Sequence, residues 1–405
     1  MPSHTTVIVG AGHAGFQLAV SLRQSGYDGT IRLINGEAEL PYQRPPLSKT
    51  YLKGEGGVAA LTFRPEKFFV EQRIDLVGDR AVAVNRAAHS VRLASGTSLA
   101  YDHLVFAMGA ANRPLPLPDP RVPVAYIRSF VETEELRLRL LRARHVVVVG
   151  AGFIGLEFAA TARAKGLEVD VVELGPRLMA RAVSPELAAF FQARHEAAGV
   201  RFHLGAQIAG AVPGGGRIGG VTLDNGTRIS ADCIVAGIGI LPNTALAAEA
   251  GLEVQSGIVV DEQLLTSDPD ISAIGDVALF PCRQIGAFAR LESVQNATDQ
   301  ARCVAARLTG KPHAYDALPW FWSDQGSDKL QIVGLFNGFD RTVVRGAPEQ
   351  GAFSVFCYKG DRLIAVESVN RAGDHVAGRK ILGAGGTITP EQAGDAAFDL
   401  RAAAR

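Results

Sequence analysis

Two glycine-rich segments of one kind each follow a short apolar run that is rich in valine and isoleucine. They are Gly10-Ala11-Gly12-His13-Ala14-Gly15, after residues 5–9, and Gly150-Ala151-Gly152-Phe153-Ile154-Gly155, after residues 146–149. In such a GxGxxG turn the first glycine permits the tight turn, the second lets the backbone approach a pyrophosphate, and the third lets helix and strand pack closely. The following helix directs its N-terminus at the phosphates. Two such turns predict two dinucleotide sites, with electrons moving from one to the other.

An acidic residue follows each fingerprint near the end of the next expected strand. Glu173 stands close to the spacing of about 20 residues at which a carboxylate binds the adenosine ribose, and Glu37, just after Gly36, stands slightly farther on. An ordinary solvated glutamate is the alternative for Glu37. A carboxylate at Glu173 would repel a 2′-phosphate and so favours NADH over NADPH, although Arg177 and Arg181 in the same loop would partly offset it.

A third signal is Gly275-Asp276, which closes the apolar run 271–274. A strand that ends in Gly-Asp resembles the second flavin fingerprint, in which the aspartate accepts hydrogen bonds from the ribityl chain. Alone, Gly-Asp is common turn chemistry. Together with the N-terminal fingerprint it predicts FAD.

The composition is that of a large globular protein with balanced charge. With 405 residues, 47% of them hydrophobic, the chain can form two or three domains. The 41 basic and 41 acidic residues cancel, which argues against a general nucleic-acid or anionic-membrane binder. Four scattered cysteines without metal-like spacing indicate free thiols in a reducing compartment. Because the first strand begins almost at once and no apolar run could span a bilayer, we expect no signal peptide and a soluble, cytoplasmic protein.

Apolar runs and turn residues define the elements of the first part of the chain. We expect a helix at 15–24 and strands at 5–9, 31–34 and 101–109. The proline-rich stretch 41–49 is expected to be a fixed loop leading into a short helix, because proline lacks an N–H group and restricts its predecessor. The prolines of 113–123 indicate a linker and the first domain boundary.

The pattern then repeats along the second part of the chain. We expect, in order, a strand at 146–149, a helix at 153–164, strands at 169–172, 234–240 and 272–277, and a long helix at 292–309. Turns at Gly214-Gly215-Gly216 and Asp224-Asn225-Gly226 bracket strands of a β-meander. At Leu241-Pro242-Asn243 we expect the chain to cross back to the first domain. From Pro319 onward, short alternating strands predict a third, α+β domain, and the tail 402–404 is expected to fray.

Four longer motifs give the chain a family resemblance. They are Arg44-Pro45-Pro46-Leu47-Ser48-Lys49, Gly152-Phe153-Ile154-Gly155-Leu156-Glu157, Glu292-Ser293-Val294-Gln295-Asn296-Ala297 and Pro319-Trp320-Phe321-Trp322-Ser323-Asp324-Gln325. With the fingerprints, they make the chain resemble the FAD-dependent pyridine-nucleotide reductases, in the ferredoxin-reductase branch typified by putidaredoxin reductase and the reductases of Rieske dioxygenase systems. The segment 341–345 and Asn370 also fit. Two departures, Met108 where the family often has threonine and Gln295 where it often has proline, bear on local hydrogen bonding more than on FAD binding.

The resemblance implies an α/β fold with two Rossmann-like dinucleotide-binding domains, as in glutathione reductase, plus a C-terminal α+β domain. Together with the proline-rich linker and the return of the chain at 241–243, the resemblance predicts the domain boundaries. The FAD-binding domain is expected at 1–113 and 242–318, the NAD-binding domain at 114–241, and the C-terminal domain at 319–405. The disulfide-reductase relatives carry a redox cysteine pair soon after the first ribose-binding strand, whereas this chain has no cysteine before Cys233. Electrons must therefore pass from the flavin directly to an external acceptor.

By the same resemblance, Lys49 and Glu157 approach each other beside the flavin N5, where the nicotinamide stacks. A lysine there would stabilise the anionic reduced flavin, and Glu157 would hold the lysine in place. An ordinary surface ion pair, worth about 0–1 kcal/mol, is the alternative. Trp322 would lie near the isoalloxazine, between the flavin and the docking surface, although a tryptophan in a short aromatic run is more often a core residue.

The other site residues are carried over position by position from the matching motifs. FAD contacts are expected from Gly10, Gly12, Ala14, Gly15, Gly36, Glu37, Arg44, Lys49, Val82, Arg128, Asp276 and Val294. NADH contacts are expected from Gly150, Gly152, Phe153, Ile154, Gly155, Glu157, Glu173, Arg181, Gly237 and Ile238. No metal ligand is expected.

The implied reaction transfers a hydride from NADH to non-covalent FAD and then single electrons to a [2Fe-2S] ferredoxin that supplies a haem monooxygenase or a Rieske dioxygenase. Such ferredoxins are acidic, so a local basic patch must steer docking despite the zero net charge. Arg64 and Arg302 correspond to docking positions of the family, and ordinary solvated arginines are the alternative. We expect a monomer or weak homodimer without nucleic-acid or membrane partners.

Two other functions stay open. Within the same fold, the chain could be a rubredoxin or monodehydroascorbate-type reductase. In a different class, it could be an NADH-sensing flavoprotein of the apoptosis-inducing-factor type, whose output is NADH-triggered dimerisation. The lack of a targeting segment and the Lys49–Glu157 pair favour turnover over signalling.

Overall fold

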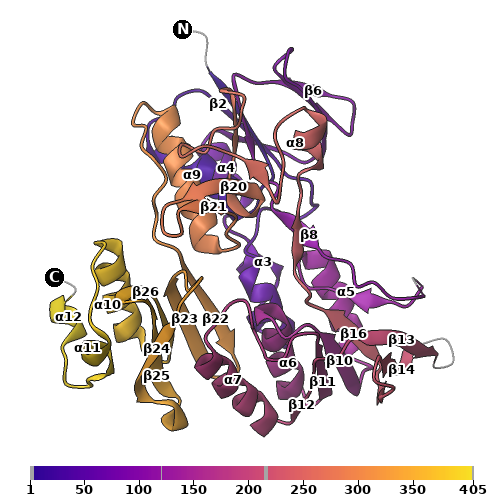
Figure 1. The fold of residues 1–405 in the computed structure, drawn as a ribbon. Coiled ribbons are helices and arrows are strands. Elements are labelled where there is room, and N and C mark those ends of the chain that lie inside the picture. The colour runs from indigo at the N-terminus through magenta and orange to yellow at the C-terminus, as the bar shows by residue number, and fades with distance from the viewer. Residues whose placement is uncertain (1–3, 120, 214–217, 404–405) are drawn as a thin grey trace. The chain divides into compact units, whose positions relative to one another are not determined.

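The computed structural model describes residues 4–119, 121–213 and 218–403, and the chain divides into two compact units (Figure 1). Unit 1 comprises Met1–Arg44, Val58–Ala111 and Leu241–Pro319, and unit 2 comprises Pro45–Gly57, Asn112–Ile240 and Trp320–Arg405. Each unit contains its own parallel sheet with a glycine fingerprint. The predicted domain boundaries at residues 113, 241 and 318 stay predictions.

Unit 1 is built on a five-stranded parallel sheet in the order β19-β7-β1-β2-β3. Its strands are β1 (Thr5–Val9), β2 (Thr30–Ile34), β3 (Ile74–Val77), β7 (His103–Phe106) and β19 (Ile271–Ala273). Val7 and Ile8 of the central strand are fully buried, as expected for a parallel sheet without a solvated face. The first fingerprint follows β1 directly, so it lies at the carboxyl end of the central strand, where α/β sheets bind their ligands.

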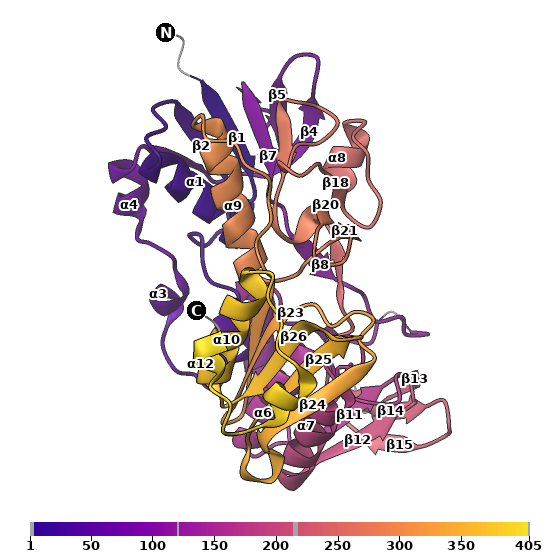
Figure 2. The ribbon, with the colours of Figure 1, turned by 60° about the vertical axis from the view of Figure 1, so that its left-hand side comes forward.

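Two helices of unit 1, α1 (His13–Gln24) and α9 (Val294–Leu308), pack side by side (Figure 2). Leu18 and Leu22 of α1 are fully buried, while α9 begins with the N-cap Ser293, whose hydroxyl accepts a hydrogen bond from the N–H of Asn296 at 3.0 Å. The predicted helix 292–309 is therefore confirmed with slightly shorter bounds. The first turns of both helices lie against Gly275, which follows β19.

Short elements complete unit 1. They are α3 (Val58–Leu61), α4 (Glu66–Glu71), α8 (Ala245–Glu249), the antiparallel sheet of β4 (Ala81–Asn85), β5 (Ser90–Leu93) and β6 (Ser98–Ala100), and the sheet of β18 (Ile258–Val259), β20 (Ala278–Cys282) and β21 (Ala287–Ala289). The strands β8 (Ala110–Asn112) and β17 (Ile240–Pro242) lie where the chain passes from one unit to the other.

Unit 2 repeats the parallel arrangement in the order β12-β11-β10-β16-β9. Its strands are β9 (Val124–Ala125), β10 (His145–Val149), β11 (Glu168–Glu173), β12 (Val200–Leu204) and β16 (Cys233–Ala236), with the helices α5 (Phe130–Leu140), α6 (Phe153–Ala164) and α7 (Pro185–Ala197). The antiparallel strands β13 (Ile208–Pro213), β14 (Ile218–Leu223) and β15 (Arg228–Ser230) share an apolar core with this sheet, formed around Val147, Val221 and Ile234. The second fingerprint lies between β10 and α6.

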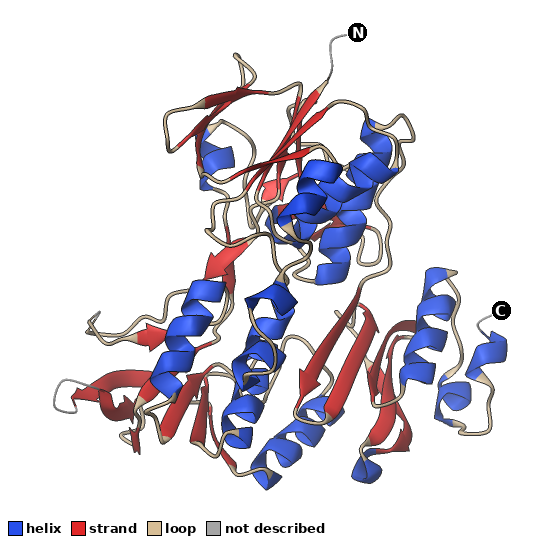
Figure 3. Cartoon of the chain, turned by 180° about the vertical axis from the view of Figure 1, so that it is seen from behind, coloured by secondary structure: helices blue, strands red, loops and turns tan. Residues whose placement is uncertain are grey.

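The C-terminal part of unit 2 is an antiparallel sheet in the order β22-β23-β26-β25-β24. Its strands are β22 (Trp320–Gln325), β23 (Asp328–Gly334), β24 (Arg341–Ala347), β25 (Ala352–Lys359) and β26 (Arg362–Val369), followed by α10 (Ala372–Gly383), α11 (Pro390–Gly394) and α12 (Leu400–Ala403). Helix α10 packs on one face of the sheet, with Gly378 against Val366, and Figure 3 shows this pairing from behind. The predicted α/β class with a C-terminal α+β part is confirmed.

A short segment, residues 45–57, belongs to unit 2 although both of its flanks belong to unit 1, and we call it the strap. It contains the 3-10 helix η1 (Pro45–Ser48) and the helix α2 (Thr50–Lys53). The hydroxyl of Tyr51 donates to Glu134 of α5 at 2.8 Å, and the hydroxyl of Thr161 in α6 donates to the carbonyl of Ser48 at 3.3 Å. The predicted fixed loop at 41–49 is thus partly helical, and contacts with α5 and α6 hold the strap in place.

Three predicted strands are wrong in extent, and a glycine with positive φ lies inside two of them. The strand expected at 234–240 ends at Ala236 before Gly239 (φ +101°), and the strand expected at 272–277 becomes β19 and the 3-10 helix η2 (Gly275–Val277), because Gly275 has φ +77°. The strand expected at 101–109 is shorter, since β7 covers only His103–Phe106, and β8 begins at Ala110, beyond the expected range.

Two further expectations concern turns and ends. The turn expected at Gly214-Gly215-Gly216 lies outside the described residues. The tail expected to fray at 402–404 is helical through Ala403 in α12, and residue 404 lies outside the description. Among the described residues, no helix has both the length and the apolar character needed to cross a bilayer.

Candidate functional site

The first fingerprint is crowded at two glycines and open at the middle one. Gly10 has φ +104°, and a Cβ atom there would lie 2.5 Å from the carbonyl oxygen of Ala107. A Cβ atom on Gly15 would lie 1.9 Å from the carbonyl oxygen of Gly10. Gly12 has an ordinary φ of −72°, and a Cβ atom there would meet nothing within 4 Å. Neither backbone conformation nor packing requires glycine at Gly12, which leaves an approaching ligand as the reason for it.

The second fingerprint repeats this geometry in unit 2. Gly150 has φ +99° with a would-be Cβ 2.6 Å from the carbonyl oxygen of Gly237, and a Cβ on Gly155 would lie 2.1 Å from the carbonyl oxygen of Gly150. Gly152 again has an ordinary φ of −80°, with its would-be Cβ no closer than 3.9 Å to any atom. Each unit therefore holds a cradle that fits a pyrophosphate.

The Gly-Asp turn brings three predicted FAD residues together in unit 1. A Cβ atom on Gly275 would lie 3.1 Å from that of Ala14 in the first turn of α1 and 3.8 Å from that of Ala297 in the first turn of α9. Asp276 follows Gly275 directly, and Val294 is the first residue of α9. Two helix N-termini and a half-buried aspartate thus converge, an arrangement that fits the pyrophosphate and ribityl groups of FAD.

A residue outside the predictions fixes this turn. Gln300 of α9 is fully buried, and its Oε1 atom accepts a hydrogen bond from the N–H of Gly275 at 2.7 Å. It holds the turn in the conformation that presents Asp276. One helical turn separates Gln300 from the motif at 292–297, and no local pattern marks it.

Glu37 and Arg44 form an ion pair in unit 1. The hydroxyl of Tyr42 also donates to Glu37 at 2.5 Å, and the guanidinium of Arg44 lies 5.3 Å from the centre of the Tyr42 ring. Burial acts to lower the pKa of Arg44, but the charges of Glu37, Tyr42 and Asp276 outweigh it, so the pKa lies above its usual value. Arg44 is therefore a fixed cation among the predicted FAD residues, and the ribose role of Glu37 stays a prediction.

The remaining predicted FAD residues are dispersed. Gly36 packs against Arg80, since a Cβ atom there would lie 3.1 Å from its Cγ atom. Val82 lies on β4 with 38% of its surface exposed. Arg128 lies in unit 2 just before α5, where its N–H donates to Glu132 at 3.1 Å. Contacts of these three residues with FAD stay predictions.

Among the residues predicted to bind NADH, Glu173 is hydrogen-bonded to the second fingerprint. Its two carboxylate oxygens accept hydrogen bonds from the N–H groups of Ala151 and Gly175, both at 2.7 Å. The guanidinium of Arg177 donates to the carbonyls of Val183 at 3.0 Å and Ala180 at 2.9 Å, so its hydrogen bonds are made within its own loop. A carboxylate at this position disfavours a 2′-phosphate.

Other predicted NADH residues lie around the same cradle. Gly237 and Ile238 border Gly150, with the Ile238 Cγ2 atom 3.3 Å from a would-be Cβ. Ile154, in the first turn of α6, is 43% exposed, and Arg181 is exposed in the loop that follows β11. These residues share one end of the unit 2 sheet.

Lys49 and Glu157 form a buried ion pair within unit 2. The Nζ atom of Lys49 lies 2.8 Å from the Oε2 atom of Glu157, and the two side chains are only 17% and 2% exposed. The hydroxyl of Ser48 donates to the same Oε2 atom at 2.6 Å, and the hydroxyl of Ser323 donates to Oε1 at 2.7 Å. This burial excludes the weak surface pair that was the alternative. Ser48 and Ser323 were not predicted as site residues, although they stand beside Lys49 and Trp322 in their motifs.

Strand alternation separates Trp322 from this pair. Phe321 and Ser323 occupy one face of β22, where the Phe321 ring lies 4.6 Å from that of Phe153 at the start of α6. Trp322 lies on the opposite face with Trp320, at a ring distance of 5.7 Å. The aromatic residue of β22 that contacts the second fingerprint is therefore Phe321, which was not predicted, and the role of Trp322 near the flavin stays a prediction.

The two predicted docking residues are both exposed in unit 1. Arg302 pairs with Asp299 one turn earlier on α9 at 2.8 Å. The guanidinium of Arg64 lies over the Phe68 ring at 5.7 Å and donates to the carbonyl of Phe63 at 2.8 Å. Both present positive charge at the surface.

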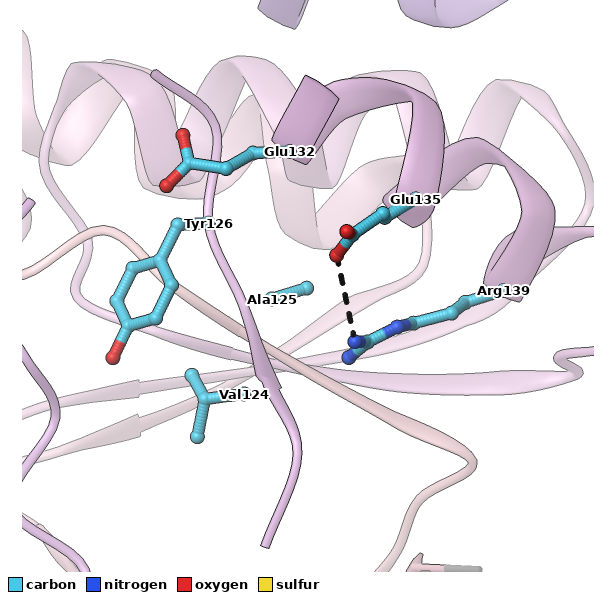
Figure 4. Close-up of a pocket in the computed structure, with 6 residues that line it drawn as sticks. All are labelled: Val124, Ala125, Tyr126, Glu132, Glu135 and Arg139. Carbon is cyan, nitrogen blue, oxygen red and sulfur yellow. Dashed lines mark ion pairs between the residues drawn. The ribbon is translucent and has the colours of Figure 1, made fainter. Parts of the chain in front are cut away.

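A small pocket elsewhere in unit 2 carries none of the predicted residues. Figure 4 shows it between β9 and α5, lined by Val124, Ala125, Tyr126, Glu132, Glu135 and Arg139. Arg139 is paired with Glu135 at 4.0 Å, and Glu132 caps α5 by accepting the N–H of Ser129 at 2.8 Å. Its acidic lining makes it unsuited to a phosphate. Within the described part of the chain, no cluster of three or more histidine, cysteine, aspartate or glutamate side chains is arranged to hold a metal ion.

The contrast between glycines gives a direct prediction. Gly15→Ala should lower the free energy of unfolding by about 1–3 kcal/mol, because its Cβ collides with the Gly10 carbonyl. Gly12→Ala should change it by less than about 0.5 kcal/mol and yet lower the FAD content of the purified protein. Urea unfolding of the apo-protein and the visible spectrum of the purified protein measure the two effects. Equal FAD content in Gly12→Ala and the wild type would refute the cradle.

Comparison with known proteins gives the family. The model of the pyridine nucleotide-disulphide oxidoreductase family matches residues 4–301, and that of the reductase C-terminal domain matches residues 320–404. Rhodocoxin reductase of Rhodococcus erythropolis is 50% identical over 399 residues, which make up 98% of this chain and 93% of the relative.

Two solved structures extend this similarity to the fold. The ferredoxin reductase for the CYP199A2 system from Rhodopseudomonas palustris matches with a TM-score of 0.98 and 58% identity, covering 100% of both chains. The reductase of the covalent putidaredoxin reductase–putidaredoxin complex matches with a TM-score of 0.96 and 39% identity, covering 100% of this chain and 98% of that one. The predicted resemblance is confirmed. The chain belongs to the pyridine nucleotide-disulphide oxidoreductase family, in its ferredoxin-reductase branch.

Proposed function

We propose that this chain is an FAD-dependent ferredoxin reductase, which passes electrons from NADH through FAD, one at a time, to a [2Fe-2S] ferredoxin. The observation that carries this function is the pair of matching cradles, one in each unit, each open only at its middle glycine. Bound FAD supplies the conversion of an electron pair from hydride into single electrons. The family assignment supports both cofactors.

The residues of unit 1 hold the FAD in this proposal. The N-termini of α1 and α9 face the pyrophosphate, where their partial positive charges are stabilising. Arg44 adds a full positive charge, and Asp276 accepts hydrogen bonds from the ribityl hydroxyls. The second cradle and Glu173 hold NADH through its pyrophosphate and adenosine ribose.

Lys49 would act where hydride is transferred. With FAD bound, its ammonium would lie beside the flavin N5, and a positive charge there would favour the reduced, anionic flavin most strongly in a site with little water. Glu157 holds that ammonium in place. A lysine side chain has much rotamer freedom, so a buried carboxylate partner reduces the entropy lost on each turnover.

The cysteines of the chain are unsuited to carry the electrons onward. All four are free and buried, and burial raises the pKa of Cys233 and Cys303 to about 11 and that of Cys282 and Cys357 above its usual value. Because the thiolate is the reactive form, these thiols are inert. The electrons therefore go to an external acceptor, and the solved reductase–putidaredoxin complex shows a relative joined to an acceptor protein.

The ferredoxin docks through positive charge that includes Arg64 and Arg302, and it supplies a haem monooxygenase or a Rieske dioxygenase. Exposed arginines steer an acidic partner even in a protein of zero net charge. We place the reaction in the cytoplasm, where four unpaired thiols are compatible with the reducing environment.

Stimulation by a ferredoxin tests the proposed acceptor. NADH-dependent reduction of cytochrome c should rise about tenfold or more when an acidic [2Fe-2S] ferredoxin is added, and the gain should fall as salt increases. Steady-state rates with ferredoxin, with rubredoxin and with neither protein give the comparison. Stimulation by rubredoxin alone would overturn the choice of acceptor. A stable charge-transfer complex that is oxidised slowly under all three conditions would support NADH sensing.

Lys49→Met tests the placement of the cation. We expect FAD reduction by NADH to slow about a hundredfold and the flavin potential to fall, because the anionic reduced form loses its cation. Stopped-flow spectroscopy and a redox titration measure the two quantities. Lys53→Met, on the same strap, is the matched control and should behave like the wild type. Unchanged rate and potential in Lys49→Met would remove the proposed role.

Glu173→Gln tests the coenzyme preference. The amide removes the charge and keeps one carbonyl acceptor, for one of the two N–H groups that the carboxylate binds, so the ratio of kcat/KM for NADH to that for NADPH should fall about tenfold. Glu168→Gln, at the opposite end of β11, is the control and should leave the ratio unchanged. A wild-type enzyme that uses both coenzymes equally would contradict the assignment.

A further inference from the structure

We propose that Ser323 is a positioning residue, whose hydroxyl fixes the carboxylate of Glu157 and, through it, the ammonium of Lys49. The inference rests on the proposed function and deepens it. It makes the C-terminal sheet part of the site at which hydride is transferred.

The two oxygens of the Glu157 carboxylate are held from different parts of the chain. Oε2 accepts from Lys49 and Ser48 of the strap, at 2.8 and 2.6 Å. Among the described residues, the donor to Oε1 is Ser323 of β22, at 2.7 Å. Ser323 is fully buried and Glu157 nearly so, so water does not substitute for this hydroxyl.

The second anchor decides the orientation of the carboxylate plane. The terminal torsion of a glutamate is broad, so a carboxylate held at one oxygen still turns about its own axis. Hydrogen bonds at both oxygens stop this rotation. The position of Oε2, and with it the position of the Lys49 ammonium, then becomes fixed.

A series of buried hydrogen bonds directs the hydrogen of the Ser323 hydroxyl to Glu157. The Nε2 atom of Gln325, two residues further along the same face of β22, lies 3.5 Å from Ser323 Oγ and donates to it. The amide oxygen of Gln325 is occupied by the ring Nε2 of His195 in α7, at 2.9 Å. A serine hydroxyl has one hydrogen to give, and with its oxygen accepting from Gln325, that hydrogen goes to Glu157.

The strand that carries Ser323 is itself fixed against α6. Phe321, on the same face, packs on Phe153, and Ser323 pairs with Leu330 of β23 in the sheet register. Leu330 is fully buried. Ser323 is therefore presented by a rigid element, which is what a positioning residue needs.

The test uses Ser323→Ala, Ser323→Cys and the control Ser354→Ala. Ser354 is also fully buried in the C-terminal sheet, but it hydrogen-bonds to Ser368 and Asp374 instead of Glu157. Cysteine keeps nearly the volume of serine with a weaker donor. Two readouts are measured: labelling of Lys49 by acetic anhydride in the apo-protein, followed by mass spectrometry, and stopped-flow reduction of the FAD-loaded protein by NADH.

For Ser323→Ala we expect Lys49 labelling to rise about threefold or more and FAD reduction to slow about tenfold, with the KM for NADH within about twofold of wild type. Ser323→Cys should be intermediate, and it supplies the test if the alanine variant does not fold. Ser354→Ala should match the wild type in both readouts. Wild-type labelling and reduction in Ser323→Ala or Ser323→Cys, or equal changes in Ser354→Ala, would overturn the proposal. Failure of the proposed function would instead appear as a wild-type protein that NADH does not reduce, while the labelling result stands independently.

Discussion

A buried carboxylate needs partners for both of its oxygens, and in this protein that requirement organises unit 2. Glu157 is almost inaccessible to water, and its charge is offset by one cation and two hydroxyl donors. These donors come from the strap and from β22, which are far from α6 in sequence. Satisfying one side chain therefore brings three segments of the chain together. The same contacts hold the positive charge of Lys49 beside α6, the helix that begins in the second fingerprint.

The second constraint comes from the two fingerprints, which share one backbone geometry. In each, the first and third glycines are required by the fold, because a Cβ atom would collide with a carbonyl oxygen. The middle glycines, Gly12 and Gly152, meet no such obstacle and have ordinary backbone angles. Their identity is explained by a ligand that approaches the backbone closely. In the proposed function one cradle takes FAD and the other takes NADH, which would give the electrons a path between two cofactors.

Sequence reasoning succeeded where the determinants are local. The glycine spacing, the valine-rich strands and the helix at 153–164 follow from neighbouring residues, and the structure reproduces them. It failed where a positive φ cuts an apolar run, as at Gly239 and Gly275, because the residue type alone does not say which conformation a glycine adopts. Ser323 and Phe321 were missed because their partners lie in α6, more than a hundred residues away in the chain. The sequence signal that could have identified Ser323 and Phe321 is their alternation with Trp322 along β22, which places them together on the other face of the strand.

The most direct test of the central claim is a crystal structure of the FAD-loaded protein reduced anaerobically with NADH. The account predicts that the Lys49 ammonium lies within hydrogen-bond distance of the flavin N5, that it keeps its contact with Glu157, and that the nicotinamide stacks on the same part of the ring. A flavin ring remote from Lys49, or a Lys49 side chain turned to solvent while the coenzyme is bound, would contradict it.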